Sequence, residues 1–247
     1  MLRRLLVACA FLSRIPIPGA GADDAGNLAR ATVFFPAVGA GIGLVLAGGA
    51  YLFLLVLPPM VSAVLVVATG ALGTGALHLD GLADTCDGLG GGRTREDALC
   101  IMRDHAVGAY GAIALALLLV LKIAALSELL AARAFLAPLV VGAALARWTT
   151  LPIAFALPYA RPEGGLGASV TGQVGWVEVV GGTILAVAVA VGVAGWKGAA
   201  FGAAALVTSA LMAAVCRRRL SGITGDTLGA TTELTEAAIL LVGVALR

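Results

Sequence analysis

Long apolar stretches alternate with short polar ones along most of the chain. The interval between Arg30 and Asp80 carries no charge, and Pro58-Pro59 divides it into two membrane lengths of apolar sequence. Because one membrane-spanning helix needs about 20 apolar residues, the pattern predicts seven spans. They lie near residues 32–57, 60–79, 107–127, 135–157, 177–195, 198–216 and 228–246. Such long runs exclude a transmembrane β-barrel and predict an all-α, polytopic membrane helix bundle.

Composition supports this class. Hydrophobic residues make up 60% of the 247 residues and charged residues 12%, whereas a soluble domain carries about 25% charged residues. Several spans are rich in glycine and alanine, and small residues let neighbouring helices approach closely. We therefore expect a compact bundle that forms a single integral-membrane catalytic domain over residues 1–247.

The basic residues predict the orientation of this bundle. With the N-terminus in the cytoplasm, seven spans place eleven basic residues inside and only Arg133, Lys197 and Arg247 outside. This asymmetry follows the positive-inside rule. All four longer hydrophilic stretches then lie on the cytoplasmic side, where we expect the chemistry.

The N-terminal segment, Met1 to Pro18, is short, apolar and basic. A signal peptide is the alternative interpretation, but Arg14 separates the apolar run from the cleavage-like triplet Ala20-Gly21-Ala22. The pattern favours an interfacial helix along the cytoplasmic face, with its arginines at the lipid headgroups. The four cysteines show no metal-ligand spacing and are expected to be free thiols.

The first acidic segment follows the second predicted span, which we expect to continue as one helix to the glycines at 88–92. Asp80, Asp84 and Asp87 are spaced four and three residues apart, so they fall within roughly 60° on a helix. Carboxylates on one face repel each other unless a cation lies between them. Mg²⁺ takes oxygen ligands and shares its remaining positions with phosphate oxygens. The spacing thus predicts a metal–diphosphate site, with a solvated acidic helix end as the alternative.

Two further features follow this segment. Thr94 is expected to cap a short helix, with Asp97 three residues on. Arg103-Asp104 comes directly before the third span. Asp104 could complete a metal site and Arg103 could hold a phosphate oxygen, or the two could form an ordinary surface pair.

The second acidic segment contains Asp226, Glu233 and Glu236, which lie within about 80° on one side of a helix. The last span needs residues 228–246 to reach a membrane length, so both glutamates enter the bilayer region. Carboxylates there need a cation or a proton. Two acidic faces on the same side of a bundle could bracket a diphosphate, although solvation at the helix end remains an alternative for Glu236.

Basic and imidazole side chains also occur against the apolar background. Lys122 and Arg147 fall inside predicted spans, where an unpaired cation is costly; each is a candidate for binding phosphate or the acids, with snorkelling as the alternative. Arg161 lies in a glycine-rich loop that could close over a phosphate or nucleotide. His78 is a second candidate for acid–base work, although a lone histidine is more often structural.

A family resemblance rests on segments that run nearly the whole length of the chain. The segment from His78 to Gly88 and the segment from Thr224 to Ala230 resemble the signatures of cobalamin synthase, also called adenosylcobinamide-GDP ribazoletransferase. The resemblance extends to residues 11–18, Phe35-Pro36 with Gly39, Thr74-Gly75, residues 101–104 with Gly108 and Gly111, Lys122, Arg147 and the Arg161 loop. That loop carries one glycine more than the expected form.

The resemblance implies a reaction and its site. The family condenses adenosylcobinamide-GDP with α-ribazole or its 5′-phosphate, releases GMP, needs Mg²⁺, and acts at the cytoplasmic face of the inner membrane of a bacterial or archaeal cell. We expect the lipid bilayer and these small molecules as partners, with other corrinoid-pathway enzymes or further copies of the chain as candidates, and no nucleic acid. The expected metal ligands are Asp80, Asp84, Asp87, Asp226 and Glu233. The first three, with Asp104, are also the catalytic candidates. The expected substrate contacts are Arg14, His78, Arg103, Lys122, Arg147, Arg161 and Thr227.

Two other interpretations of the acids remain open at this point. A CDP-alcohol phosphatidyltransferase or a membrane prenyltransferase would also use aspartates and Mg²⁺, but with other spacings and without the segment from Thr224 to Glu236. A divalent-cation transporter would place acids at the bilayer midplane, whereas these cluster near one face.

Overall fold

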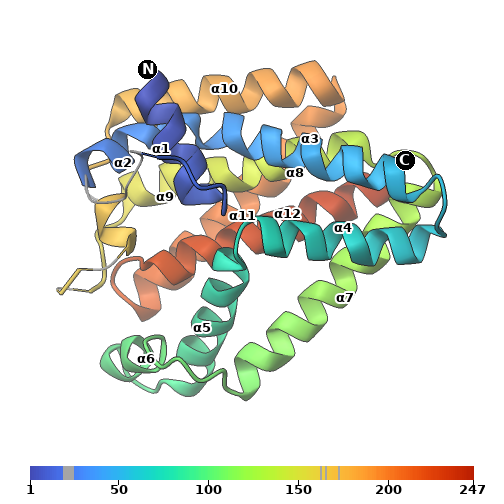
Figure 1. Cartoon of the computed structure of the whole chain (residues 1–247). Coiled ribbons are helices and arrows are strands. Elements are labelled where there is room, and N and C mark those ends of the chain that lie inside the picture. The colour runs from blue at the N-terminus through green and yellow to red at the C-terminus, as the bar shows by residue number, and fades with distance from the viewer. Residues whose placement is uncertain (19–24, 162, 165, 172) are drawn as a thin grey trace.

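The computed structural model describes residues 1–18, 25–161, 163–164, 166–171 and 173–247 (Figure 1). The triplet Ala20-Gly21-Ala22 and two residues of the Arg161 loop, Pro162 and Gly165, lie outside the described residues. The helices are α1 (Leu2–Leu12), α2 (Ala25–Ala31), η1 (Thr32–Phe34), α3 (Phe35–Phe53), α4 (Pro59–Gly73), α5 (Leu77–Gly91), α6 (Arg95–Ile101), α7 (Ala109–Ala131), α8 (Leu136–Trp148), α9 (Thr150–Ala156), η2 (Leu166–Ser169), α10 (Trp176–Ala194), α11 (Lys197–Arg219) and α12 (Gly225–Ala245).

Most of the predicted spans are confirmed. Among the described residues, six segments are long and apolar enough to cross a membrane: Leu28–Phe53, Ala109–Ala131, Leu136–Ala156, Trp176–Ala194, Lys197–Arg219 and Gly225–Ala245. They match the first, third, fourth, fifth, sixth and seventh predictions to within a few residues. The protein is therefore a multi-pass, all-α membrane protein.

The second predicted span is where the structure differs. α4 and α5 meet at an angle of 89°, so the acidic helix does not continue span two. The chain turns at Gly75 and Ala76, whose φ angles of 67° and 56° are incompatible with a right-handed helix. α5 also continues through Gly88 and ends at Gly91; Gly88 lies inside the helix, packed closely against Ala98 of α6 and against Met102, which follows α6.

Close backbone contacts hold the bundle together. A Cβ on Gly39 would lie 2.3 Å from the carbonyl oxygen of Ala143, and one on Gly43 would lie 2.5 Å from that of Leu139. α3 and α8 thus pack at a distance that only glycine permits. α12 lies at the centre and contacts α5, α7, α8 and α11. α10 lies outside, with Ile184, Val187 and other large apolar side chains exposed where lipid would cover them.

The two ends of the bundle differ. At one end Arg247 pairs with Glu128 at 2.6 Å, and the Lys197 ammonium donates to the Leu246 carbonyl at 2.6 Å. α1, α5 and α6 lie toward the opposite end, together with the segments that lead into α10 and α12 (Figure 1). α1 forms within the predicted N-terminal segment and crosses this end rather than running along the bundle. All four cysteines are free, as expected.

Candidate active site

Three carboxylates gather where α5 meets the first turn of α12. Asp80 and Asp84 lie one helical turn apart on α5, and Asp226 is in the first turn of α12. The two helices touch at Gly81, where a Cβ would come within 2.8 Å of the Asp226 carbonyl oxygen. The charges of Asp80 and Asp226 both act on Asp84. We call Asp80, Asp84 and Asp226 the acidic site; it combines residues from both predicted acidic segments.

Arg161 neutralises one of these carboxylates. Its guanidinium donates to Asp226 Oδ2 at 2.7 Å and to the Met102 carbonyl at 3.2 Å. Two backbone hydrogen bonds fix the segment that leads to Arg161 beside the start of α12. Ala160 N donates to the Ile223 carbonyl at 2.7 Å, and Ile223 N donates to the Pro158 carbonyl at 2.9 Å. A guanidinium held next to carboxylates can exchange an acid for a phosphate oxygen with similar geometry.

Arg103 lies on the loop that Arg161 contacts. Its guanidinium is 2.5 Å from Glu163 Oε2. A hydrogen bond from the backbone of Glu163 and the neighbouring Arg103 lower the pKa of the Glu163 carboxyl. Asp104 is exposed, and its carboxylate accepts a hydrogen bond from Ala106 N at 3.0 Å. The structure therefore brings Arg103 to the Arg161 loop, and Asp104 to the turn before α7.

Asp87 has a different place from the one predicted. It is buried, and its two oxygens accept hydrogen bonds from Gly108 N at 2.7 Å and Gly111 N at 2.9 Å. These amides begin α7 and have no acceptor within that helix. Because both carboxylate oxygens face the α7 N-terminus, the structure assigns Asp87 to capping α7 rather than to the acidic site.

Thr227 is also a correction. Its side chain is buried in a capping box: Thr227 Oγ1 accepts from Thr224 N at 3.0 Å, and Thr224 Oγ1 accepts from Thr227 N at 3.2 Å. These bonds start α12 and thereby position Asp226, so the buried hydroxyl of Thr227 serves the helix cap. The other predicted cap is confirmed, since Thr94 and Asp97 form a capping box at α6.

Arg14 lies at the break between α4 and α5. Its backbone N donates to the Gly73 carbonyl at 2.9 Å, and its side chain covers Gly75, where a Cβ would lie 2.6 Å from Nε. This turn therefore needs glycine at position 75 for two reasons: its positive φ and its close contact with the Arg14 side chain. Arg14 remains a predicted substrate contact.

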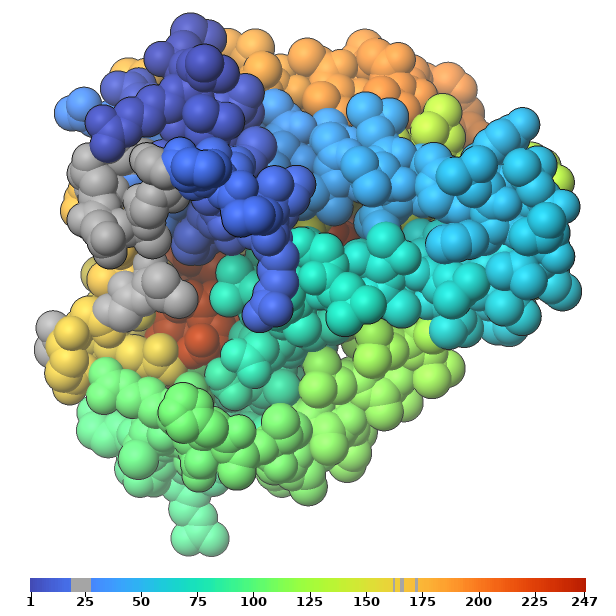
Figure 2. All heavy atoms as spheres, in the orientation of Figure 1, coloured from blue at the N-terminus to red at the C-terminus, as the bar shows by residue number. Residues whose placement is uncertain are grey.

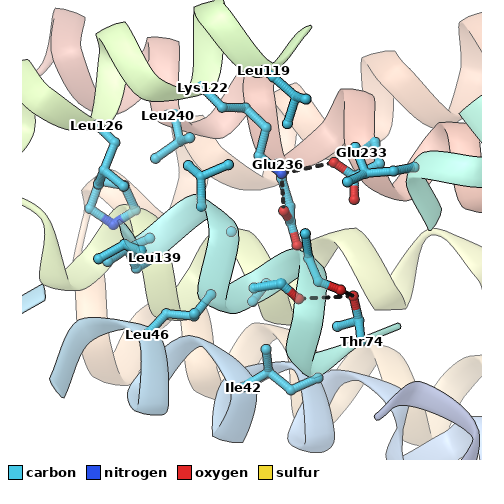
Figure 3. Close-up of a pocket in the computed structure, with 18 of the residues that line it drawn as sticks. Ile42, Leu46, Thr74, Leu119, Lys122, Leu126, Leu139, Glu233, Glu236 and Leu240 are labelled. Atoms are coloured by element: carbon cyan, nitrogen blue, oxygen red, sulfur yellow. Dashed lines mark hydrogen bonds and ion pairs between the residues drawn. The ribbon is translucent and has the colours of Figure 1, made fainter. Parts of the chain in front are cut away.

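Deeper in the bundle, four charged side chains neutralise one another. Lys122 Nζ lies 2.8 Å from Glu233 Oε2 and 2.6 Å from Glu236 Oε2, and Arg147 pairs with the other oxygen of Glu236. Figure 3 shows Lys122 reaching from α7 toward both glutamates of α12, beside an apolar pocket lined by Leu46, Leu126 and Leu139. We call Lys122, Arg147, Glu233 and Glu236 the internal charge cluster. Two cations balance two anions, which lowers the cost of charge in the membrane.

This cluster corrects the prediction for Glu233. Seven residues of helix separate it from Asp226, a rise of about 10 Å, and Lys122 binds it in the bundle interior. Glu233 therefore does not join Asp226 in facing the aspartates of α5. Lys122 is likewise a partner of glutamates in this structure rather than a free group for phosphate.

A cavity of about 160 Å³ adjoins the acidic site. His78, Arg147, Asp80 and Asp226 all contribute to its lining. Figure 2 shows a recess at this end, where atoms of α12 (red) are visible between the N-terminal segment (blue), α5 (teal) and the segment after α9 (yellow). His78 and Arg147 thus lie at one cavity, and both remain predicted substrate contacts.

Several lining residues were not predicted as site residues. Phe11 and Phe35 form part of the cavity wall, as do Thr150 and Gly225. Phe11 and Phe35 belong to segments that carry the family resemblance, which was the available signal. Glu236 was predicted on the second acidic face, with solvation at the helix end as the alternative; its pairing with both Lys122 and Arg147 depends on three helices meeting.

The acidic site offers only oxygen donors. Among the described residues, no group of three or more His, Cys, Asp or Glu side chains could hold a metal ion by itself. Mg²⁺, however, is usually held by one or two carboxylates together with water and substrate phosphates. The pair Asp84 and Asp226 fits that second arrangement, and their mutual repulsion favours a cation between them.

Comparison with known proteins identifies the family of the chain. The model of the cobalamin-5-phosphate synthase family matches residues 4–244. A protein of Geotalea daltonii named adenosylcobinamide-GDP ribazoletransferase is 39% identical over 246 residues, which cover 100% of this chain and 98% of the relative. Relatives of the same name from Azorhizobium caulinodans and Chlorobium phaeobacteroides are 43% and 37% identical, covering 95% and 98% of this chain and 92% and 98% of theirs. No solved structure matches significantly. The chain belongs to the cobalamin-5-phosphate synthase family.

Proposed function

We propose that this protein is an adenosylcobinamide-GDP ribazoletransferase, which joins the activated corrinoid to α-ribazole or its 5′-phosphate in a late step of cobalamin assembly. The observation that carries the proposal is the acidic site, flanked by Arg161 and Arg103, in a chain whose relatives bear that name over nearly their whole length. Carboxylates and guanidinium groups at one place suit a reaction at a diphosphate, where negative charge must be positioned and neutralised.

The transfer is a displacement at phosphorus. A ribose hydroxyl oxygen of α-ribazole attacks the phosphorus nearer cobinamide in the diphosphate. A phosphorus–oxygen bond forms to the ribose, the bond to the bridging oxygen breaks, and GMP leaves with that oxygen and its electron pair. The product is a phosphodiester that links cobinamide to ribazole. The hydroxyl proton passes to a carboxylate of the acidic site, and Asp80 is the acceptor we favour because it lines the adjacent cavity.

The basic residues hold the donor substrate. Arg161 moves from Asp226 to a phosphate oxygen when the diphosphate enters, since one guanidinium can bind either partner. Arg103 likewise leaves the exposed Glu163 and binds a phosphate oxygen, because its pair with Glu163 holds it beside the Arg161 loop. These contacts hold the phosphorus in line with the attacking hydroxyl, and orientation of this kind supplies a large part of the rate enhancement.

Magnesium belongs to the same proposal. Asp84 and Asp226 would hold Mg²⁺ together with the substrate's phosphates, and the ion would supply charge neutralisation at the diphosphate. Asp87 would act indirectly by holding α7 against α5. The site would face the cytoplasm of the inner membrane, because the basic residues concentrate at the end of the bundle that carries the acidic site.

A turnover assay tests the proposal. Purified protein in nanodiscs would receive adenosylcobinamide-GDP, α-ribazole and Mg²⁺, with products separated by chromatography. We expect GMP and a cobalamin in equal amounts, and loss of both on chelation. A folded, inserted sample that makes neither product, or that carries divalent cations across liposomes instead, would overturn the assignment.

A further inference from the structure

Most of the wall of the cavity beside the acidic site has no role in the reaction chemistry above. Its volume of about 160 Å³ matches the roughly 150 Å³ at which an apolar protein cavity admits an aromatic ring. It is lined by α1, α3, α5, α8, α9, α12 and the segment around η2. A cavity built from so many elements is a property of the tertiary fold rather than a surface irregularity.

Its apolar wall suits a planar ring. Phe11 of α1 and Phe35 of α3 stack with their ring centroids 5.8 Å apart and their planes inclined by 13°. Aromatic groups packed against such rings gain about 0.5–1.5 kcal/mol beyond the area that they bury, so the wall favours an aromatic ligand over an aliphatic one. The aliphatic remainder of the wall comes from Leu12, Leu77, Val170 and Leu228.

The polar residues that line the cavity are His78, Asp80, Arg147, Thr150, Asp226 and Thr232. His78 and Arg147 are 7% and 3% exposed, and within the described chain His78 Nδ1 and Arg147 Nε have no hydrogen-bond partner. Buried groups without partners are costly, so a ligand that offers a ring nitrogen to this region would relieve that cost after a small side-chain adjustment. The acids Asp80 and Asp226 line the same cavity on the side of the acidic site.

We propose that this cavity binds the dimethylbenzimidazole base of the acceptor, α-ribazole, and thereby presents its ribose to Asp80. The proposal rests on the transferase function proposed above. The base has two fused rings, two methyl groups and one free ring nitrogen, and it carries no N–H group in the nucleoside. This matches the apolar wall that Phe11, Phe35 and the aliphatic side chains form, with the polar groups confined to the rest of the lining.

The guanine of the donor fits less well. Its N1–H and amino group are donors that need acceptors when buried, so guanine brings more hydrogen-bonding groups into a mainly apolar wall than the base of the acceptor does. The carboxylates that could accept lie toward the acidic site, where they meet the phosphates. The same chemistry thus selects the acceptor's base for the cavity and leaves the guanosine outside it.

Equilibrium dialysis tests this assignment separately from turnover. Protein in nanodiscs would be dialysed against α-ribazole, or free 5,6-dimethylbenzimidazole, without Mg²⁺ or corrinoid. Phe11→Leu removes one stacked ring and is expected to raise the dissociation constant about threefold to tenfold. Val170→Phe fills the cavity and should abolish binding. Phe155→Leu is the matched control, because Phe155 packs against Trp176 with ring centroids 4.6 Å apart, away from the cavity, and should bind like the wild type.

The outcomes separate the two proposals. The cavity assignment is overturned if the wild type binds neither ligand, if both cavity variants bind like the wild type, or if GMP displaces the bound base. In active enzyme, Phe11→Leu should raise KM for α-ribazole and leave KM for adenosylcobinamide-GDP unchanged. Turnover with an unchanged KM for α-ribazole in that variant would refute the cavity assignment and leave the transferase function standing. Binding of the base without any transfer would refute the transferase function and leave the cavity assignment standing.

Discussion

At the residue scale, Asp84 and Asp87 show that neighbouring carboxylates on one helix can have different roles. They lie three residues apart on α5. Asp84 faces Asp80 and Asp226, and Asp87 accepts two amide hydrogen bonds from α7. The spacing alone groups all three aspartates of α5, because it cannot indicate where the first amides of α7 will lie. Of the five predicted metal ligands, Asp80, Asp84 and Asp226 meet at the acidic site, whereas Asp87 caps α7 and Glu233 pairs with Lys122.

The capping role of Asp87 predicts a loss of stability on truncation. Asp87→Ala removes two charge-assisted hydrogen bonds and leaves buried amides without acceptors, at a cost of about 2–4 kcal/mol. We expect a lower midpoint of thermal unfolding in detergent. Asp97→Ala is the control, since Asp97 is an exposed capping acid and should cost about 1 kcal/mol or less. Equal midpoints for the two variants would argue against this role.

The internal charge cluster gives a second prediction. Lys122→Met leaves Glu233 without its partner in the bundle interior, and breaking a buried pair in this way costs about 3–5 kcal/mol. Lys122→Met with Glu233→Gln restores the balance of charge and should recover much of that loss. Thermal unfolding of both single variants and the double variant measures the coupling. Additive losses in the double variant would show that the two side chains do not stabilise each other.

At the element scale, helix positions follow from local hydropathy and caps, whereas helix contacts do not. Thr94 and Thr224 are the N-caps of α6 and α12, and each helix begins at the next residue. The turn between α4 and α5 cannot be predicted from hydropathy and caps, because the apolar run passes through it without a proline. Gly75, covered by Arg14, permits the turn, and that contact joins residues far apart in the sequence.

Glycine packing between α3 and α8 yields a paired prediction. Gly39→Ala would place a methyl group 2.3 Å from the Ala143 carbonyl oxygen, so the helices must separate, at a cost of about 1–3 kcal/mol. Gly41→Ala meets nothing within 4 Å and should be neutral or slightly stabilising, because alanine favours a helix. Thermal unfolding of the pair checks this; similar losses in both would mean that helix approach is not the cause.

At the scale of the whole molecule, the asymmetry of the bundle joins sequence to function. The polar stretches that bear nine of the fourteen acidic residues supply both helices of the acidic site. The resemblance predicted the family and pointed to most of the candidate site residues that lie at this end. The sequence could not show that Lys122, Arg147, Glu233 and Glu236 pair with one another, since their choice of partners is decided by where α7, α8 and α12 meet.

The orientation in the membrane can be measured through Cys100, an exposed thiol on α6. If the acidic end faces the cytoplasm, a membrane-impermeant maleimide should label Cys100 in inverted vesicles and not in intact cells. Cys100→Ser with Arg247→Cys should show the reverse, because Arg247 lies at the opposite end of the bundle. Labelling of Cys100 in intact cells would contradict the proposed orientation.

The most direct measurement for the account as a whole is the turnover of Asp84→Asn against Glu96→Gln in nanodiscs, with adenosylcobinamide-GDP, α-ribazole and Mg²⁺. The asparagine side chain would keep the shape of the aspartate and lose the charge that the acidic site needs, so we expect the rate to fall at least about 100-fold with insertion and thermal stability unchanged. Glu96 is exposed on α6, and its variant should match the wild type. Equal formation of GMP and cobalamin by all three proteins would contradict catalysis at the acidic site.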